Sequence, residues 1–99
     1  MTEPRLTEQA EADLEELWVY IAARNVDVAD RMVDAVLEGS RTHVRFPNMG
    51  QNREYLRPGL RSFVVSPFVV FYRSIEDTIE VLRVLHGARD IDSIIQAGD

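Results

Sequence analysis

Apolar residues in the first quarter of the chain recur at the spacing of an amphipathic helix. Leu14, Leu17, Trp18 and Ile21 occupy positions i, i+3, i+4 and i+7, which fall on one helical face. Thr7 lies just before this stretch, and threonine is a common N-cap residue. The pattern predicts a helix that begins after Thr7 and buries this apolar face, Trp18 included, in the core.

A second helix is predicted after a short interruption at residues 24–26. Asp27 can cap it, and it should end at Phe46, because the residue before a proline is disfavoured in helical conformation. His43, near its C-terminal end, is expected to face solvent or to complement the helix dipole. The two helices predict an antiparallel hairpin. The expected inward face of the second helix consists of Ala29, Val33, Val36, Leu37, Ser40 and Val44.

The spacing changes in the second half of the chain, where valine and phenylalanine dominate. Leu60–Val65 and Phe68–Arg73 predict a β-hairpin, and Thr78–Leu85 predicts a third strand. Residues 47–59 are rich in turn formers and predict a loop. Alternation in the third strand would place Ile79, Val81, Arg83 and Leu85 on one face and Glu80, Leu82 and Val84 on the other.

Short elements are predicted near both ends, a strand at Pro4–Leu6 and a helix at Ala88–Gln96. The element order is then β-α-α-β-β-β with a final helix, an α+β fold with a helical hairpin packed on an antiparallel sheet. One domain, residues 1–99, is expected at this length. Because the strands carry apolar residues on both faces, one hairpin would leave a sheet face uncovered. A second amphipathic chain is expected to fill it.

Composition places the chain among ordinary globular proteins, with 45% hydrophobic and 28% charged residues. It has no cysteine, which excludes disulfides and thiolate chemistry, and its basic residues are all arginines, which excludes lysine Schiff-base chemistry. The longest uncharged run, Ser62–Tyr72, is too short to span a bilayer, and no signal-peptide pattern precedes the first helix. A cytoplasmic location without membrane association is expected.

The net charge of −6 argues against a protein that mainly grips nucleic acid, and no sequence-specific nucleic-acid binding is expected. The charge is uneven. Residues 1–40 contain ten acidic residues and three arginines, whereas residues 41–91 contain eight arginines and five acidic residues. Two isolated histidines do not have the spacing of a metal site, so neither a metal nor a cofactor is expected.

Several short motifs, in order along the chain, resemble those of the ParE toxins of the RelE/ParE superfamily of type II toxin–antitoxin systems. The resemblance extends over roughly residues 5–92 and is carried by AEADLEELWVYIA at 10–22, FPNMG at 46–50, RPGLRSF at 57–63, VFYR at 70–73 and VLRVLHGARD at 81–90. It implies a helical hairpin on an antiparallel sheet. It also implies a toxin that inhibits DNA gyrase by stabilising its cleaved-DNA complex and that a ParD-like antitoxin neutralises in a hetero-oligomer.

The related RelE branch instead cuts mRNA on the ribosome, and the same resemblance allows that activity to be considered. One catalytic arginine of that branch falls on Val69 and its tyrosine falls near Ile95, while a second arginine matches Arg89. The catalytic set is therefore incomplete, and a non-enzymatic inhibitor is expected, with no catalytic residues. The alternatives are a ribosome-dependent mRNA endonuclease and a non-toxic homologue that only binds partner chains.

Residues expected to contact the target or the antitoxin are Arg61, Phe68, Tyr72, Arg83, His86, Arg89, Ile94 and Ile95. His86 lies beside Gly87 at a strand end, where imidazole serves either as a cap of the following turn or as an acid–base group. Arg83 and Arg89 either pair with carboxylates, such as Glu80 or the helical acids, or bind a partner.

Overall fold

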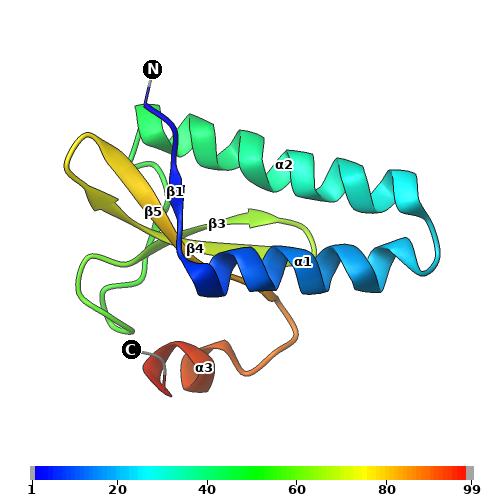
Figure 1. Cartoon of the computed structure of the whole chain (residues 1–99). Coiled ribbons are helices and arrows are strands. Elements are labelled where there is room, and N and C mark those ends of the chain that lie inside the picture. The colour runs from blue at the N-terminus through cyan, green and yellow to red at the C-terminus, as the bar shows by residue number, and fades with distance from the viewer. Residues whose placement is uncertain (1, 98–99) are drawn as a thin grey trace.

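A five-stranded sheet lies between a helical hairpin and a short third helix in the computed structural model, which describes residues 2–97 (Figure 1). The strand order is β1-β5-β4-β3-β2, and all neighbours are antiparallel except β1 and β5. The expected α+β fold is confirmed, with a mixed rather than a purely antiparallel sheet. Along the chain the elements are β1 (Arg5–Leu6), α1 (Glu8–Ala22), α2 (Val26–Arg45), β2 (Gln51–Asn52), β3 (Arg61–Val65), β4 (Phe68–Ile75), β5 (Thr78–His86) and α3 (Ile91–Ala97).

The helical hairpin forms as predicted, with one correction at its turn. Thr7 caps α1, since its Oγ1 accepts a hydrogen bond from the backbone N–H of Ala10 at 3.0 Å. Asn25, not Asp27, caps α2, because its side-chain oxygen accepts from the N–H of Val28 at 3.0 Å. The helix therefore begins two residues earlier than the expected cap allowed.

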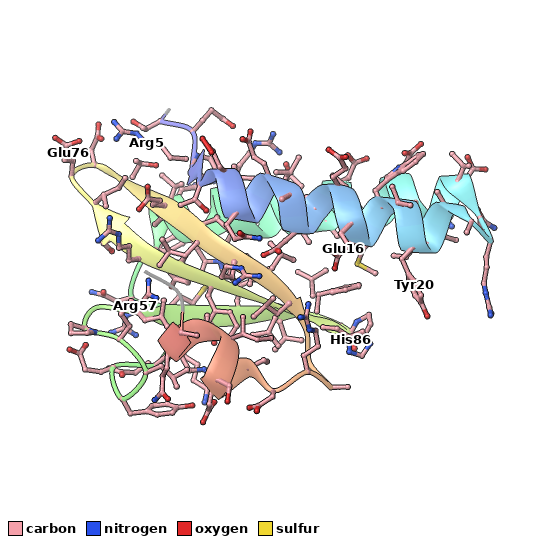
Figure 2. The ribbon with its side chains drawn as sticks, turned by 60° about the horizontal axis from the view of Figure 1, so that its bottom comes forward. Arg5, Glu16, Tyr20, Arg57, Glu76 and His86 are labelled. Atoms are coloured by element: carbon pink, nitrogen blue, oxygen red, sulfur yellow. The ribbon has the colours of Figure 1, made fainter. Side chains whose placement is uncertain are left out.

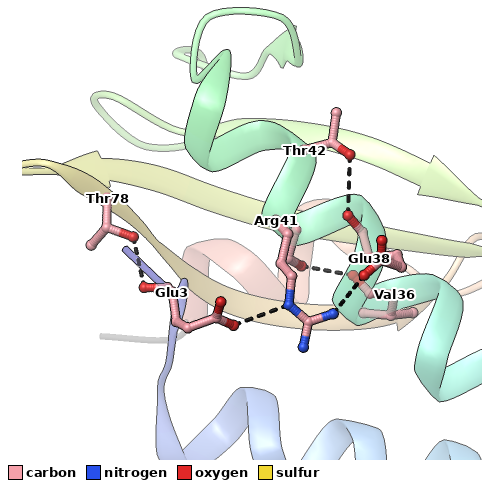
Figure 3. Close-up of polar contacts among 7 residues, drawn as sticks. Glu3, Val36, Glu38, Arg41, Thr42 and Thr78 are labelled. Carbon is pink, nitrogen blue, oxygen red and sulfur yellow. Dashed lines mark hydrogen bonds and ion pairs between the residues drawn. The ribbon is translucent and has the colours of Figure 1, made fainter. Parts of the chain in front are cut away.

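The N-terminal segment is tied to α2 and to β5 by hydrogen bonds that Glu3 accepts (Figure 3). Its carboxylate accepts from Nε of Arg41 on α2 at 3.0 Å, and its carbonyl accepts from Oγ1 of Thr78 on β5 at 2.9 Å. Arg41 also donates to Glu38 at 2.7 Å. These bonds fix the chain just before β1, which is only two residues long.

A β-bulge at Leu82 alters the side-chain pattern of β5. Phe71 pairs with Arg83 but the next residue, Tyr72, pairs with Val81, so Leu82 has no opposite partner. Its carbonyl accepts a hydrogen bond from Thr7 Oγ1 at 3.0 Å. The predicted alternation of β5 is wrong beyond this point, because the extra residue moves Val84 onto the face that Ile79 and Val81 share.

Two hydrophobic cores lie on opposite faces of the sheet. The hairpin covers the larger core, built on β4 and β5 and on the apolar faces of both helices. Trp18, which was expected in this core, is only half-buried, and its Nε1 donates to Asp30 on α2 at 2.8 Å. The opposite face is covered by α3 and residues 53–60, which enclose Leu56, Leu60, Val69, Phe71, Leu85 and Ile95. The expectation of an uncovered sheet face is therefore wrong. The chain closes both faces with its own segments, one of them a helix of seven residues.

His43 is buried, not solvent-facing as expected from its place near the end of α2. Its side chain is 6% exposed, its ring stacks on Phe63 with centroids 4.1 Å apart, and Nδ1 donates to the carbonyl of Gly39 at 2.7 Å. Gly39 itself contacts the Phe63 ring, where a Cβ atom would approach within 2.7 Å. The ring thus joins the larger core at the junction of α2 and β3.

Candidate functional site

The eight residues expected to contact partners fall in three separate places. Arg83, Ile94 and Ile95 line a groove between α1, β5 and α3. Phe68, His86 and Arg89 line a notch at the end of the sheet, and Arg61 and Tyr72 hold the loop after α2. Sequence spacing alone did not separate these groups, because each combines segments that are distant in the chain.

The groove between α1 and α3, hereafter the α3 groove, has a volume of about 330 Å³. Its apolar surface comes from β5, from the loop before β3 and from α3, and its polar surface comes from the first turn of α1 and two arginines. Ile95 is buried and Ile94 is half-buried, so Ile94 is the helix residue that the groove exposes. The lining residues are Thr7, Glu8, Gln9, Arg57, Leu60, Leu82, Arg83, Ile94 and Ile95.

Arg83 and Arg57, which both line this groove, have structural partners. Nε and Nη2 of Arg83 donate to the carboxylate of Asp13 at 2.8 and 3.1 Å, and that carboxylate also accepts from the N–H of Val84. Of the two roles left open for Arg83, the structure shows the pairing with a helical acid. Arg57 donates from Nη2 to the carbonyl of Ile95 at 2.8 Å, which fastens α3 to the loop before β3.

The notch lies where α1 overhangs the end of β5 and has a volume of about 210 Å³. Figure 2 shows Glu16 and Tyr20 on α1 directed toward the side on which His86 lies. Nδ1 of His86 accepts from the N–H of Ala88 at 3.0 Å, which confirms that this ring caps the turn after β5. The ring also meets Phe68 edge-on, with centroids 5.5 Å apart. Arg89 is exposed at the rim.

Tyr72 and Arg61 fix the loop that follows α2. The Tyr72 hydroxyl donates to the carbonyl of Pro47 at 2.7 Å and accepts from the N–H of Gly50 at 3.0 Å. Nη1 of Arg61 donates to the carbonyl of Asn48 at 3.2 Å and to that of Gly50 at 2.8 Å. Burial of the ring raises the pKa of Tyr72, and the neighbouring Arg61 charge only partly opposes this.

The loop held by Tyr72 and Arg61 exposes two large apolar side chains, Phe46 and Met49. Neither was among the contact residues expected from the sequence. Phe46 is 57% exposed and Met49 is 55% exposed. Both are exposed although Tyr72 and Arg61 hold the backbone of this loop by hydrogen bonds. The sequence feature that could have indicated these exposed side chains is the FPNMG motif at residues 46–50. Its Pro47 carbonyl and Gly50 N–H are the backbone groups that hydrogen-bond to Tyr72.

Two of the three positions matched to RelE-type catalytic residues lie within the smaller core, and the third, Arg89, is exposed. Val69 is 9% exposed and Ile95 is 3% exposed, and both belong to the cluster beneath α3. Within residues 2–97, no three histidine, aspartate or glutamate side chains gather as a metal site requires. Among the same residues, no helix is long and apolar enough to cross a membrane.

Comparison with known proteins links residues 5–91 to one family of toxins. A family model described as "ParE toxin of type II toxin-antitoxin system, parDE" matches residues 5–91. Toxin ParE1 of Caulobacter vibrioides is 40% identical over 86 residues, which cover 83% of this chain and 85% of that protein. Toxin ParE1 of Mycobacterium tuberculosis is 34% identical over 89 residues, covering 88% of this chain and 91% of that protein.

A solved structure shares the fold. The structure described as the chromosomal ParDE TA system from P. aeruginosa superimposes with a TM-score of 0.70 at 25% sequence identity. The superposition covers 87% of this chain and 96% of the other.

Proposed function

The chain belongs to the ParE toxin family of type II toxin–antitoxin systems, and from this we propose that it inhibits DNA gyrase by stabilising gyrase's cleaved-DNA complex. A ParD-like antitoxin would hold it inactive until released. Inhibition of this kind requires tighter binding to one state of the target than to the others, and it requires no catalytic residue.

The burial of Val69 and Ile95 is the observation that best supports inhibition without catalysis. RNA cleavage at a 2′-hydroxyl requires a proton acceptor, a proton donor and cations at the phosphate. Two of the matched positions hold aliphatic side chains sealed in a core, and Arg83 is neutralised by Asp13. Arg89 alone retains an exposed side chain at a matched position. This arrangement supports an inhibitor over a nuclease.

The α3 groove is the surface that best fits an antitoxin segment. It is lined by three of the expected contact residues, and its apolar residues Leu60, Leu82 and Ile94 come from the loop before β3, from β5 and from α3. An amphipathic segment laid across it would remove these side chains from water. Its polar side would meet the first turn of α1 and the guanidinium groups at the walls.

The direct test adds the purified toxin to gyrase, ATP and supercoiled plasmid, followed by detergent and protease. Linear plasmid should accumulate with toxin concentration, and it should be absent when gyrase is omitted or when the antitoxin is added first. Unchanged supercoiling by a folded, antitoxin-free toxin would contradict gyrase as the target. Cleavage of mRNA by the same sample in a translation extract would instead support the RelE-type activity.

A further inference from the structure

The loop after α2 forms an open hollow beside the end of that helix, hereafter the loop shelf, with a volume of about 470 Å³. Phe46 and Met49 supply its large apolar side chains, and each is more than half exposed. The N–H of Met49 donates to the carbonyl of Phe46 at 3.0 Å, so a single backbone turn carries both. The residues that line the shelf are consecutive and form one continuous surface: Arg45, Phe46, Pro47, Asn48 and Met49.

Hydrogen bonds from the sheet hold the backbone of the loop shelf. The Tyr72 hydroxyl binds the Pro47 carbonyl and the Gly50 N–H, and Arg61 donates to the carbonyls of Asn48 and Gly50. Side chains on a fixed backbone lose less conformational freedom when a partner binds them, which favours affinity. Aromatic residues, methionine and arginine are also the types enriched where proteins contact one another. The shelf therefore has the rigidity and the composition of a protein contact surface.

The charge of the loop shelf is positive. Arg45 lies over the ring of Phe46, with Cζ 6.0 Å from its centroid. Among residues 2–97, neither Arg45 nor Arg61 belongs to an ion pair, and the residues that line the shelf include no carboxylate. A protein surface with an apolar hollow and carboxylates at its border would be complementary to this arrangement. Nucleic acid is less suited, because its binding requires many phosphate contacts and the chain's net charge of −6 opposes them.

The loop shelf is separate from the α3 groove. No residue in the described part of the chain lines both, and α2 and α3 lie on opposite sides of the sheet (Figure 1). An antitoxin segment seated in the groove would therefore not cover Phe46 or Met49. These side chains are available for a second protein partner.

We propose that the loop shelf is the surface with which the toxin binds its protein target, and that Phe46 and Met49 enter an apolar hollow of the target whose border carries carboxylates. The identity of this target as gyrase rests on the proposed function. An aromatic side chain desolvated at the centre of an interface commonly provides a large part of the binding energy. Arg45 pairs with a carboxylate at the border and mainly directs association.

The test compares gyrase-dependent plasmid cleavage, and growth arrest of a bacterial host without antitoxin, between the full chain and its variants. Phe46→Ala should raise the toxin concentration needed for half-maximal cleavage at least about tenfold. Arg45→Gln should raise it by no more than about fivefold, because an ion pair at a border contributes little. Both side chains are exposed, so neither substitution opens the core. Growth arrest should weaken in the same order.

Two substitutions serve as matched controls. Tyr55→Ala removes an aromatic side chain that is 64% exposed and does not line the shelf. Arg31→Gln removes a charge that is also exposed on α2, about 21 Å from Arg45 along the helix. Both controls should act as the wild type does, and all four variants should bind the antitoxin with unchanged affinity in calorimetric titration.

Full cleavage and full growth arrest by Phe46→Ala would overturn the proposal, as would equal losses in Phe46→Ala and Tyr55→Ala. Weaker antitoxin binding by Phe46→Ala, with unchanged cleavage, would assign the shelf to the antitoxin instead. Growth arrest by the wild type without gyrase-dependent cleavage would remove gyrase as the target, and the growth comparison would then decide the role of the shelf. A wild type that causes neither effect would overturn both proposals.

Discussion

Asp13 and Arg83 are 70 residues apart in sequence, yet they form a two-point ion pair that joins α1 to β5. The side chain of Asp13 is 8% exposed and that of Arg83 is 20% exposed. The same carboxylate accepts from the N–H of Val84, so it satisfies three donors. One acidic side chain therefore positions the helical hairpin on the strand that borders the α3 groove.

Asp13→Asn should lower the free energy of unfolding by about 2 kcal/mol, because an amide offers one acceptor oxygen and no charge to these donors. Chemical denaturation measures this change. Glu15→Gln is the control, since Glu15 is exposed on the same helix and should change stability by less than about 0.5 kcal/mol. Equal stability of the two variants would show that the ion pair contributes nothing.

Gly50→Ala should destabilise the protein by about 1–3 kcal/mol through overpacking. A Cβ atom at this position would lie 2.9 Å from the carbonyl oxygen of Ser62 and closer still to the hydroxyl of Tyr72. Gly59→Asn provides a contrast. Gly59 has a φ of +77°, which asparagine tolerates, and no atom lies within 4 Å of the added Cβ. Thermal unfolding should separate the two variants, and a similar melting temperature for both would argue against the close contact.

Tyr72→Phe should cost about 1–3 kcal/mol, because it leaves the Pro47 carbonyl and the Gly50 N–H without their partner. It should also alter the alkaline limb of the stability profile. Since the folded pKa of Tyr72 is raised, the unfolded chain ionises first, and stability should fall as pH rises above about 10 toward that higher pKa. Denaturation at several alkaline pH values should show a shallower fall for Tyr72→Phe, but not for Tyr20→Phe, whose ring is exposed.

Ile94→Asp should weaken binding of the antitoxin by at least about tenfold, because it places a carboxylate in the apolar part of the α3 groove. Calorimetric titration with the antitoxin measures the affinity. Ser93→Asp adds the same charge at an exposed position of α3 and should bind as the wild type does. Far-ultraviolet circular dichroism should establish that both variants are folded. Unchanged affinity of the folded Ile94→Asp protein would remove the groove as the antitoxin site.

The sequence predicted those parts of the fold that depend on local spacing. Helical periodicity placed α1 and α2, and the buried residues of α2 include the expected Ala29, Val36 and Ser40. Strand β2 was missed because two paired residues, Gln51 and Asn52, leave no periodic signal. The faces of β5 were assigned wrongly because a bulge depends on the pairing with β4 and leaves no mark in β5 alone.

The candidate site was predicted less well, because it depends on contacts between distant segments. The pairing of Arg83 with a helical acid was anticipated, but its partner could not be chosen among many carboxylates. Ile94 and Ile95 were grouped as a surface, whereas the turn of α3 buries one and leaves the other half-exposed. The sequence pattern places Tyr72 in a strand. Only the fold shows that its hydroxyl donates to the carbonyl of Pro47, 25 residues earlier in the chain.

Because β1 has only two residues, most of β5 has no strand on its outer side, and this bears on where a further strand could pair with the sheet. Beyond Leu6, the outer backbone groups of β5 are occupied by α1 and its cap: Thr7 bonds the carbonyls of Val81 and Leu82, and Asp13 bonds the N–H of Val84. Side chains thus complete this edge strand where a neighbouring strand would otherwise pair. At the other border, β2 pairs only with Arg61 and Ser62, and within residues 2–97 no strand flanks the outer side of Phe63–Val65. A strand donated by another protein would therefore find unpaired backbone groups beside Phe63–Val65, whereas those of residues 81–84 are already bonded.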